Sequence, residues 1–215
     1  MRLDRADNVP NLLLPLIFLF WIIWAAVLIV AHTGLHLTCR IERKTPTGPA
    51  RPLSPAIYCC WHDSLIGYLV GHRQFDEQMV IIINFDWYMQ PVHWFARCMR
   101  VTHIIKFFPR ESNKQVAADA IAYLQKGSSQ LHLPDGPRGP LRVMKKGVLH
   151  IAATSGVPVV PVRVTCSHSF QFPWAWDKKR VPLPFSKLIL EYAEPVHVSP
   201  HNFDEAERRI FSGLG

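Results

Sequence analysis

The sequence predicts an α/β domain: a central, mostly parallel sheet covered by helices on both faces, preceded by an N-terminal membrane helix. Apolar strand-like runs alternate with helix-like segments through short connections, which is typical of such sheets. The run Met79–Ile83 is apolar on both faces, as in a strand that helices cover on each side. Leu12–Ala31 carries no charge and is long enough to cross a hydrocarbon layer of ~30 Å. We therefore divide the chain into an anchor, 1–35, and an α/β domain, 36–215.

The elements follow from hydrophobic periodicity and from the Gly and Pro residues that interrupt it. Strands are predicted at Leu37–Arg43, Ala56–Cys60, Met79–Ile83, Val101–Phe107, around Leu131, at Val157–Val164 and at Leu188–Tyr192. Helices are predicted after Ser64 to about His72, at Gln90–Met99, from Ser112 or Asn113 to Gly127, and at Lys145–Thr154. Thr45–Pro55 is predicted to be a linker, and the aromatic, proline-rich stretch Phe170–Pro184 a long loop.

The N-terminal apolar run has two interpretations. Arg2 and Arg5 resemble the basic start of a signal peptide, but the run is longer than an ordinary signal core and no A-x-A site follows Ala31. We expect a retained anchor that either spans the bilayer or lies in one leaflet. Basic residues are more numerous after the run than before it, which favours a cytoplasmic position for the main domain; they are Arg40, Arg43, Lys44 and Arg51.

The net charge indicates which classes of partner to expect, and the cysteine content indicates the redox compartment. The formal net charge is +8 and the isoelectric point about 9.5, which favours anionic partners such as lipid head groups or phosphorylated substrates. The sequence contains no Lys/Arg block and no zinc-type spacing, so a nucleic-acid partner is disfavoured. The five cysteines form no CxxC pair and their number is odd, so free thiols in a reducing compartment are expected.

Chemically useful side chains are predicted at three strand ends: His62 with Asp63, Arg110, and Asp135 with Arg138. The carboxyl ends of parallel strands meet at one edge, where ligands of open α/β sheets bind. A histidine is the usual general base near neutral pH, and a carboxylate on its second nitrogen fixes the tautomer. Arginine matches phosphate oxygens with its planar fork.

These pieces together resemble the lysophospholipid acyltransferases of the glycerolipid-acyltransferase superfamily. The likeness is greatest to a small bacterial branch, once a domain of unknown function, with an Asp-Gly-Pro-Arg-Gly-Pro loop. It covers about residues 56–198 and rests on ordered motifs: Trp61-His62, Asp135-Gly136-Pro137-Arg138-Gly139-Pro140, Gly147, Gly156-Val157-Pro158-Val159-Val160-Pro161-Val162, and Trp176-Asp177 before Pro182-Leu183-Pro184-Phe185.

The resemblance implies a role for each motif. His62 would be the general base. Arg110 would bind the phosphate of the acceptor together with the loop residues Asp135, Gly136, Pro137, Arg138 and Gly139.

One departure concerns the carboxylate partner of His62. The superfamily places an aspartate five residues after its histidine, where this chain has Gly67. Asp63 is adjacent, but consecutive side chains do not face each other on a helix. We expect Asp86, at the end of the next strand, to be the partner, with Asp135 as the second candidate.

The expected function is therefore transfer of a fatty acyl group from acyl-CoA or acyl-carrier protein to a hydroxyl of a lysophospholipid. The enzyme would act at membrane lipids, on the cytoplasmic side of a bacterial inner membrane, with no metal or other cofactor. A non-catalytic lipid- or phosphate-binding protein is the alternative, supported by Gly67. A metal-dependent hydrolase is disfavoured because no HExxH-like spacing is present.

Overall fold

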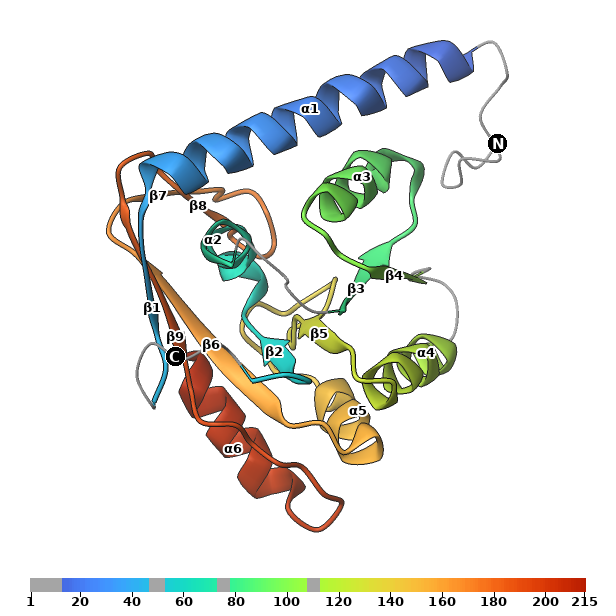
Figure 1. The fold of residues 1–215 in the computed structure, drawn as a ribbon, viewed down its shortest axis with the longest axis vertical. Coiled ribbons are helices and arrows are strands. Elements are labelled where there is room, and N and C mark those ends of the chain that lie inside the picture. The colour runs from blue at the N-terminus through green and yellow to red at the C-terminus, as the bar shows by residue number, and fades with distance from the viewer. Residues whose placement is uncertain (1–12, 47–52, 73–77, 108–112) are drawn as a thin grey trace.

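The computed structural model describes residues 13–46, 53–72, 78–107 and 113–215. Its centre is a seven-stranded sheet in the order β1-β9-β6-β2-β5-β3-β4 (Figure 1). Within it, every neighbouring pair is parallel except β6 and β9. The predicted mostly parallel α/β sheet is confirmed. Its strands are β1 (Arg40–Lys44), β2 (Ile57–Cys59), β3 (Met79–Asn84), β4 (His103–Phe107), β5 (Ser129–His132), β6 (Val159–Cys166) and β9 (Lys187–Tyr192).

Helices cover both faces of this sheet, as Figure 1 shows. One face carries α1 (Leu14–Thr38), α2 (Leu65–Gly71) and α3 (Gln90–Cys98), and the other carries α4 (Asn113–Gln125), α5 (Gly147–Ser155) and α6 (Phe203–Leu214). Strand β2 shows how one strand serves both layers. Tyr58 packs in the first core and its neighbours Ile57 and Cys59 in the second, because successive side chains of a strand point to opposite faces.

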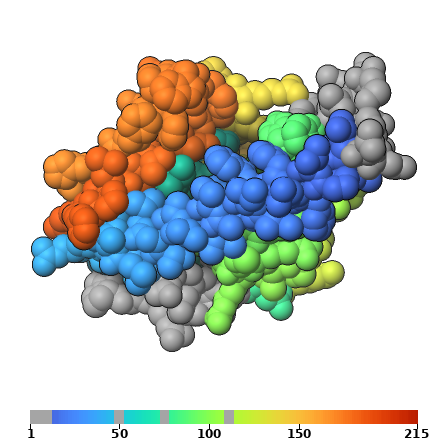
Figure 2. All heavy atoms as spheres, turned by 90° about the horizontal axis from the view of Figure 1, so that it is seen from above, coloured from blue at the N-terminus to red at the C-terminus, as the bar shows by residue number. Residues whose placement is uncertain are grey.

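Helix α1 lies along the domain. Figure 2 shows it crossing one face of the molecule, with the β7–β8 region in orange beside its C-terminal half. Its inward side packs on α3 through ring contacts such as that of Trp21 with Trp94, whose centroids are 6.1 Å apart. Most of its remaining side is exposed and apolar, as at Leu16, Leu19 and Ile23. By length and composition it is one helix able to cross a membrane.

The end of α1 is also bonded to the end of α2. His32 Nε2 lies 3.1 Å from the Leu69 carbonyl oxygen, and His36 Nδ1 lies 2.9 Å from that of Val70. Arg43 Nε donates to the next carbonyl, that of Gly71, at 2.9 Å. Three basic side chains thus satisfy three successive carbonyls that a helix end leaves without intrahelical partners. These bonds hold the start of the chain to the α/β domain.

Two predicted elements differ from the structure. Leu37 and Thr38 belong to α1 and not to a strand, so β1 begins at Arg40. The expected loop Phe170–Pro184 contains a small hairpin formed by β7 (Ser169–Gln171) and β8 (Arg180–Pro182). The predicted linker Thr45–Pro55 lies partly outside the described residues.

Candidate active site

The register of β2 and β5 brings two predicted site residues together. The strands are parallel, and Cys59 pairs with His132 at their carboxyl ends. His62 follows Cys59 by three residues and Asp135 follows His132 by three. Trp61 keeps an extended backbone, and a short 3₁₀ turn, His62–Ser64, then presents the histidine at the sheet edge. Two strand ends of equal length therefore place the imidazole beside the carboxylate.

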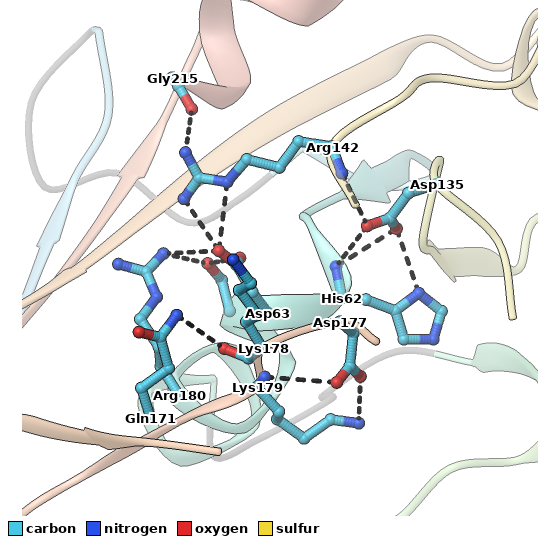
Figure 3. Close-up of polar contacts among 11 residues, drawn as sticks. His62, Asp63, Asp135, Arg142, Gln171, Asp177, Lys178, Lys179, Arg180 and Gly215 are labelled. Carbon is cyan, nitrogen blue, oxygen red and sulfur yellow. Dashed lines mark hydrogen bonds and ion pairs between the residues drawn. The ribbon is translucent and has the colours of Figure 1, made fainter. Parts of the chain in front are cut away.

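His62 and Asp135 form a hydrogen-bonded pair (Figure 3). His62 Nδ1 lies 3.1 Å from Asp135 Oδ1, and the His62 backbone N–H also points at the carboxylate, 3.3 Å from the same oxygen. Asp135 is completely buried, whereas the His62 side chain is 15% exposed. An ionised carboxylate only accepts hydrogen bonds, so it requires the proton on Nδ1 and leaves the Nε2 lone pair for a substrate.

The predicted partner Asp86 is wrong. Its carboxylate accepts hydrogen bonds from the Asn84 side-chain amide and from the Tyr88 hydroxyl, the latter at 2.9 Å. The sheet order gives the physical reason: β5 lies between β2 and β3, so the strand end nearest His62 is that of β5. Asp86 instead joins local bonds around the short helical turn Trp87–Met89.

Asp63 faces away from the imidazole, toward two arginines (Figure 3). Its Oδ2 accepts from Arg142 Nη2 at 2.9 Å and from Arg180 Nη2 at 3.1 Å, while Ser64 Oγ donates to Oδ1 at 2.6 Å. Asp63 is only 4% exposed, so these cations offset the cost of burying its charge. The contacts connect the turn of His62 to the loop after β5 and to β8, which is a positioning role.

The loop Asp135–Pro140 needs glycine at two positions. Gly136 and Gly139 have φ values of +68° and +62°, in the region that side chains other than glycine rarely adopt. The Gly136 N–H donates to the Leu133 carbonyl at 3.0 Å, which closes the turn directly after the strand. The sharp turn places Asp135 inward, while Pro137 and Arg138 line the adjacent cavity. Arg110 lies outside the described residues, so its predicted role stays a prediction.

A cavity of about 660 Å³ opens beside His62. Its walls are mostly apolar side chains of α2, β3 and α3, with further contributions from β5; among them are Leu65, Leu69, Ile81, Ile83, Val92, Phe95, Met99 and Leu131. Its lining also includes His62 and three cationic side chains: Arg138, Lys145 and Lys179. An apolar pocket with a few polar groups is typical of a ligand site, and this composition suits an apolar chain attached to an anionic group.

The glycine at position 67 is explained by packing. A Cβ added there would lie 2.9 Å from Val164 Cγ1 and 3.3 Å from Leu188 Cδ1, because α2 packs directly on β6 and β9. An aspartate at this position would require the Val164 and Leu188 side chains to shift. In this chain the loop after β5 supplies the carboxylate that contacts the histidine.

Sequence reasoning missed His132, which also lines the cavity. Burial lowers its pKa to about 4, with His62 also lowering the pKa and Asp135 acting in the opposite direction. Its Nδ1 lies 3.3 Å from Gln130 Nε2, which agrees with a neutral ring. The one available signal was a histidine three residues before Asp135 in a strand that is otherwise apolar at its end. Within the described ranges, no cluster of three or more His, Cys, Asp or Glu side chains could hold a metal ion.

Comparison with known proteins identifies the fold. A crystal structure of the 1-acyl-sn-glycerophosphate acyltransferase PlsC from Thermotoga maritima superimposes with a TM-score of 0.53. The match covers 87% of this chain and 78% of that one, at 20% sequence identity. The fold is that of this acyltransferase.

Two curated sequences are also similar. A 1-acyl-sn-glycerol-3-phosphate acyltransferase of Cocos nucifera is 28% identical over 148 residues, which are 66% of this chain and 46% of that protein. An uncharacterised protein of Rickettsia prowazekii is 29% identical over 76 residues, or 35% of this chain and 34% of that protein. The chain thus spans less than half the length of these relatives. No protein-family model matches it.

The pairing of His62 with Asp135 yields a prediction that separates the two candidate carboxylates. Asp135→Asn should lower the rate of the acyl transfer implied by the motifs by roughly a hundredfold or more, because an amide does not hold the required tautomer. Asp86→Asn should leave the rate within about twofold, because its carboxylate bonds to Asn84 and Tyr88 and not to the imidazole. Turnover and thermal unfolding are measured for both variants. A larger loss in Asp86→Asn would contradict the assignment.

The lowered pKa of His132 yields a prediction for stability. The unfolded chain takes up a proton at this histidine near pH 6.5, whereas the folded protein takes it up only near pH 4. The free energy of unfolding should therefore fall as the pH is lowered from about 6.5 to about 4, by up to ~1.4 kcal/mol per pH unit. Denaturant titrations of the parent and His132→Asn at several pH values check this. Equal slopes in both proteins would contradict it.

Proposed function

We propose that this chain is a membrane-associated acyltransferase that moves a fatty acyl group from a thioester donor to the hydroxyl of a lysophospholipid. The observation that carries the proposal is the pairing of His62 Nδ1 with the buried Asp135 carboxylate beside an apolar cavity. The similarity to 1-acyl-glycerol-3-phosphate acyltransferases supports the same chemistry.

The proposed mechanism begins with His62 as general base. Its Nε2 takes the proton of the acceptor hydroxyl as that oxygen attacks the thioester carbonyl carbon. The carbon–sulfur bond then breaks, and the proton passes from the imidazolium to the leaving thiolate. Asp135 stabilises the imidazolium while it exists, because its completely buried carboxylate lies 3.1 Å from Nδ1.

The cavity has apolar walls and a set of cationic side chains, and we expect each to bind a different part of the substrates. The apolar walls would hold an acyl chain, whose burial contributes about 0.8 kcal/mol per methylene group. Arg138, Lys145 and Lys179 would bind the phosphate of the acceptor, joined by Arg110 if it lies as the motif implies. The donor thioester would be acyl-CoA or acyl-carrier protein.

Membrane attachment would use the exposed side of α1. This side is apolar, and Figure 2 places it on the same face as the β7–β8 region, which carries the exposed aromatic residue Phe170. The packing of α1 along α2 and α3 favours a helix lying in one leaflet with the domain against it, since a spanning helix would draw those helices into the hydrocarbon layer. We propose that the domain lies on the cytoplasmic side.

The alternative of a non-catalytic lipid-binding protein has lost its main support. That support was the glycine at position 67, and Asp135 provides the missing carboxylate from another strand. The two readings still differ in one measurable property, because only an enzyme forms a new diacyl lipid.

Mass spectrometry of products tests the proposal. Full-length protein in detergent, given acyl-CoA or acyl-carrier protein and a mixed lysolipid extract, should form a diacyl species. His62→Ala should reduce the rate by about a thousandfold, since it removes the base. His150→Ala, which changes an exposed histidine of α5 on the opposite face of the sheet, should retain it. Lysolipid binding without product from either donor would contradict the enzyme and favour the binding protein.

A further inference from the structure

Trp176 contacts the imidazole that would act as base. Its ring lies edge-on to that of His62, with centroids 5.2 Å apart and an interplanar angle of 61°. The tryptophan also lines the cavity, and it is 41% exposed on its outer side. It therefore contacts the imidazole, lines the same cavity and is partly accessible to solvent.

The loop after β5 is shaped to receive this tryptophan. A Cβ added to Gly139 would lie 2.6 Å from both Cε3 and Cζ3 of Trp176, closer than carbon atoms approach. Glycine at position 139 thus lets the indole rest directly on the backbone of the loop. Asp135 begins this same loop, so the tryptophan contacts both the histidine and the segment that orients it.

The segment that carries Trp176 is braced. Asp177 is only 4% exposed, and its carboxylate contacts Lys179 Nζ at 2.9 Å and the Lys179 N–H at 3.3 Å. The Phe172 N–H donates to the Lys179 carbonyl at 3.0 Å, which closes the base of the loop between β7 and β8. Arg180, at the start of β8, binds Asp63 in the turn of His62. The position of the indole over the histidine is therefore fixed from both ends.

A base of this kind needs protection from water. The transfer has no step that distinguishes a lipid hydroxyl from water chemically: either oxygen can lose a proton to Nε2 and attack the thioester carbonyl. With water, the carbon–sulfur bond breaks, the proton passes to the thiolate, and the products are a free fatty acid and a thiol. Excluding water from the site is a recognised way to prevent this side reaction.

We propose that Trp176 is the residue that sets the selectivity of this site for a lipid hydroxyl over water. It does so by closing the solvent side of His62, so that the acceptor reaches Nε2 only from the cavity. The inference rests on the proposed acyltransferase activity. It adds a residue that determines selectivity and that is neither His62 nor part of the loop Asp135–Pro140.

The test compares two tryptophans of one loop. Trp174 is 74% exposed, and its ring contacts are with Phe170 and with Phe172, the latter at 5.4 Å between centroids, so Trp174→Ala is the matched control. The protein in mixed micelles receives lysophosphatidic acid with either acyl-CoA or acyl-carrier protein, and the free fatty acid and the diacyl product are quantified together. Trp176→Ala should raise the ratio of hydrolysis to transfer by about tenfold. Trp176→Phe should raise it less, and Trp174→Ala should not change it.

A second variant tests the same contact without removing the indole. Gly139→Ala should displace Trp176 and raise the ratio in the same direction, and adding it to Trp176→Ala should change the ratio little further. Thermal unfolding of each variant shows whether the fold is kept. If Trp176→Ala does not fold, Trp176→Phe still reports on the contact.

The outcomes separate this inference from the proposed function. A wild-type protein that consumes neither acyl-CoA nor acyl-carrier protein contradicts the proposed function, and the inference with it. A wild-type protein that forms the diacyl lipid, with a ratio unchanged in Trp176→Ala, contradicts the inference alone. Equal losses of hydrolysis and transfer would also contradict it, because they indicate that the indole supports the imidazolium and does not select the acceptor.

Discussion

The parallel pairing of β2 with β5 is the constraint on which the rest of this site depends. With Cys59 opposite His132, the next three residues of each strand end carry His62 and Asp135 to the same place. The hydrogen bond between them then decides the tautomer of the imidazole, the burial of the carboxylate and the direction in which the base faces. The cavity, the cationic side chains in its lining and the tryptophan over the ring are all arranged around this pair.

The charges around the pair are arranged in two separate groups. Asp135 binds the imidazole and accepts backbone bonds, whereas Asp63, the next residue after His62, binds Arg142 and Arg180. Adjacent residues on a tight turn point in different directions, so the carboxylate of Asp63 does not compete for Nδ1. The arginines instead join the turn to the loop after β5 and to β8, which limits the movement of His62 relative to Asp135. A buried charge left without these partners would destabilise the turn that holds the base.

The sequence was enough to predict the sheet, most of its strands, the apolar helix and the residues that gather at the carboxyl edge, because these depend on local pattern and on motifs. It was not enough to predict strand order. Asp86 and Asp135 are equivalent from local pattern, and only the position of β5 between β2 and β3 decides between them. The meaning of Gly67 likewise depends on Val164 and Leu188, which are about a hundred residues away in the chain. The contact between Trp176 and His62 also joins residues that are far apart in the chain, so local pattern could not predict it.

The measurement that tests the account most directly is the tautomeric state of His62. Nitrogen NMR of the histidine-labelled protein, with the signal assigned by its loss in His62→Ala, reports which ring nitrogen carries the proton once the ring is neutral. The account predicts a proton on Nδ1, held by Asp135, and an unprotonated Nε2 available to the acceptor hydroxyl. A proton on Nε2 would mean that Asp135 does not orient the imidazole, and it would contradict the assignment of His62 as a base facing the cavity.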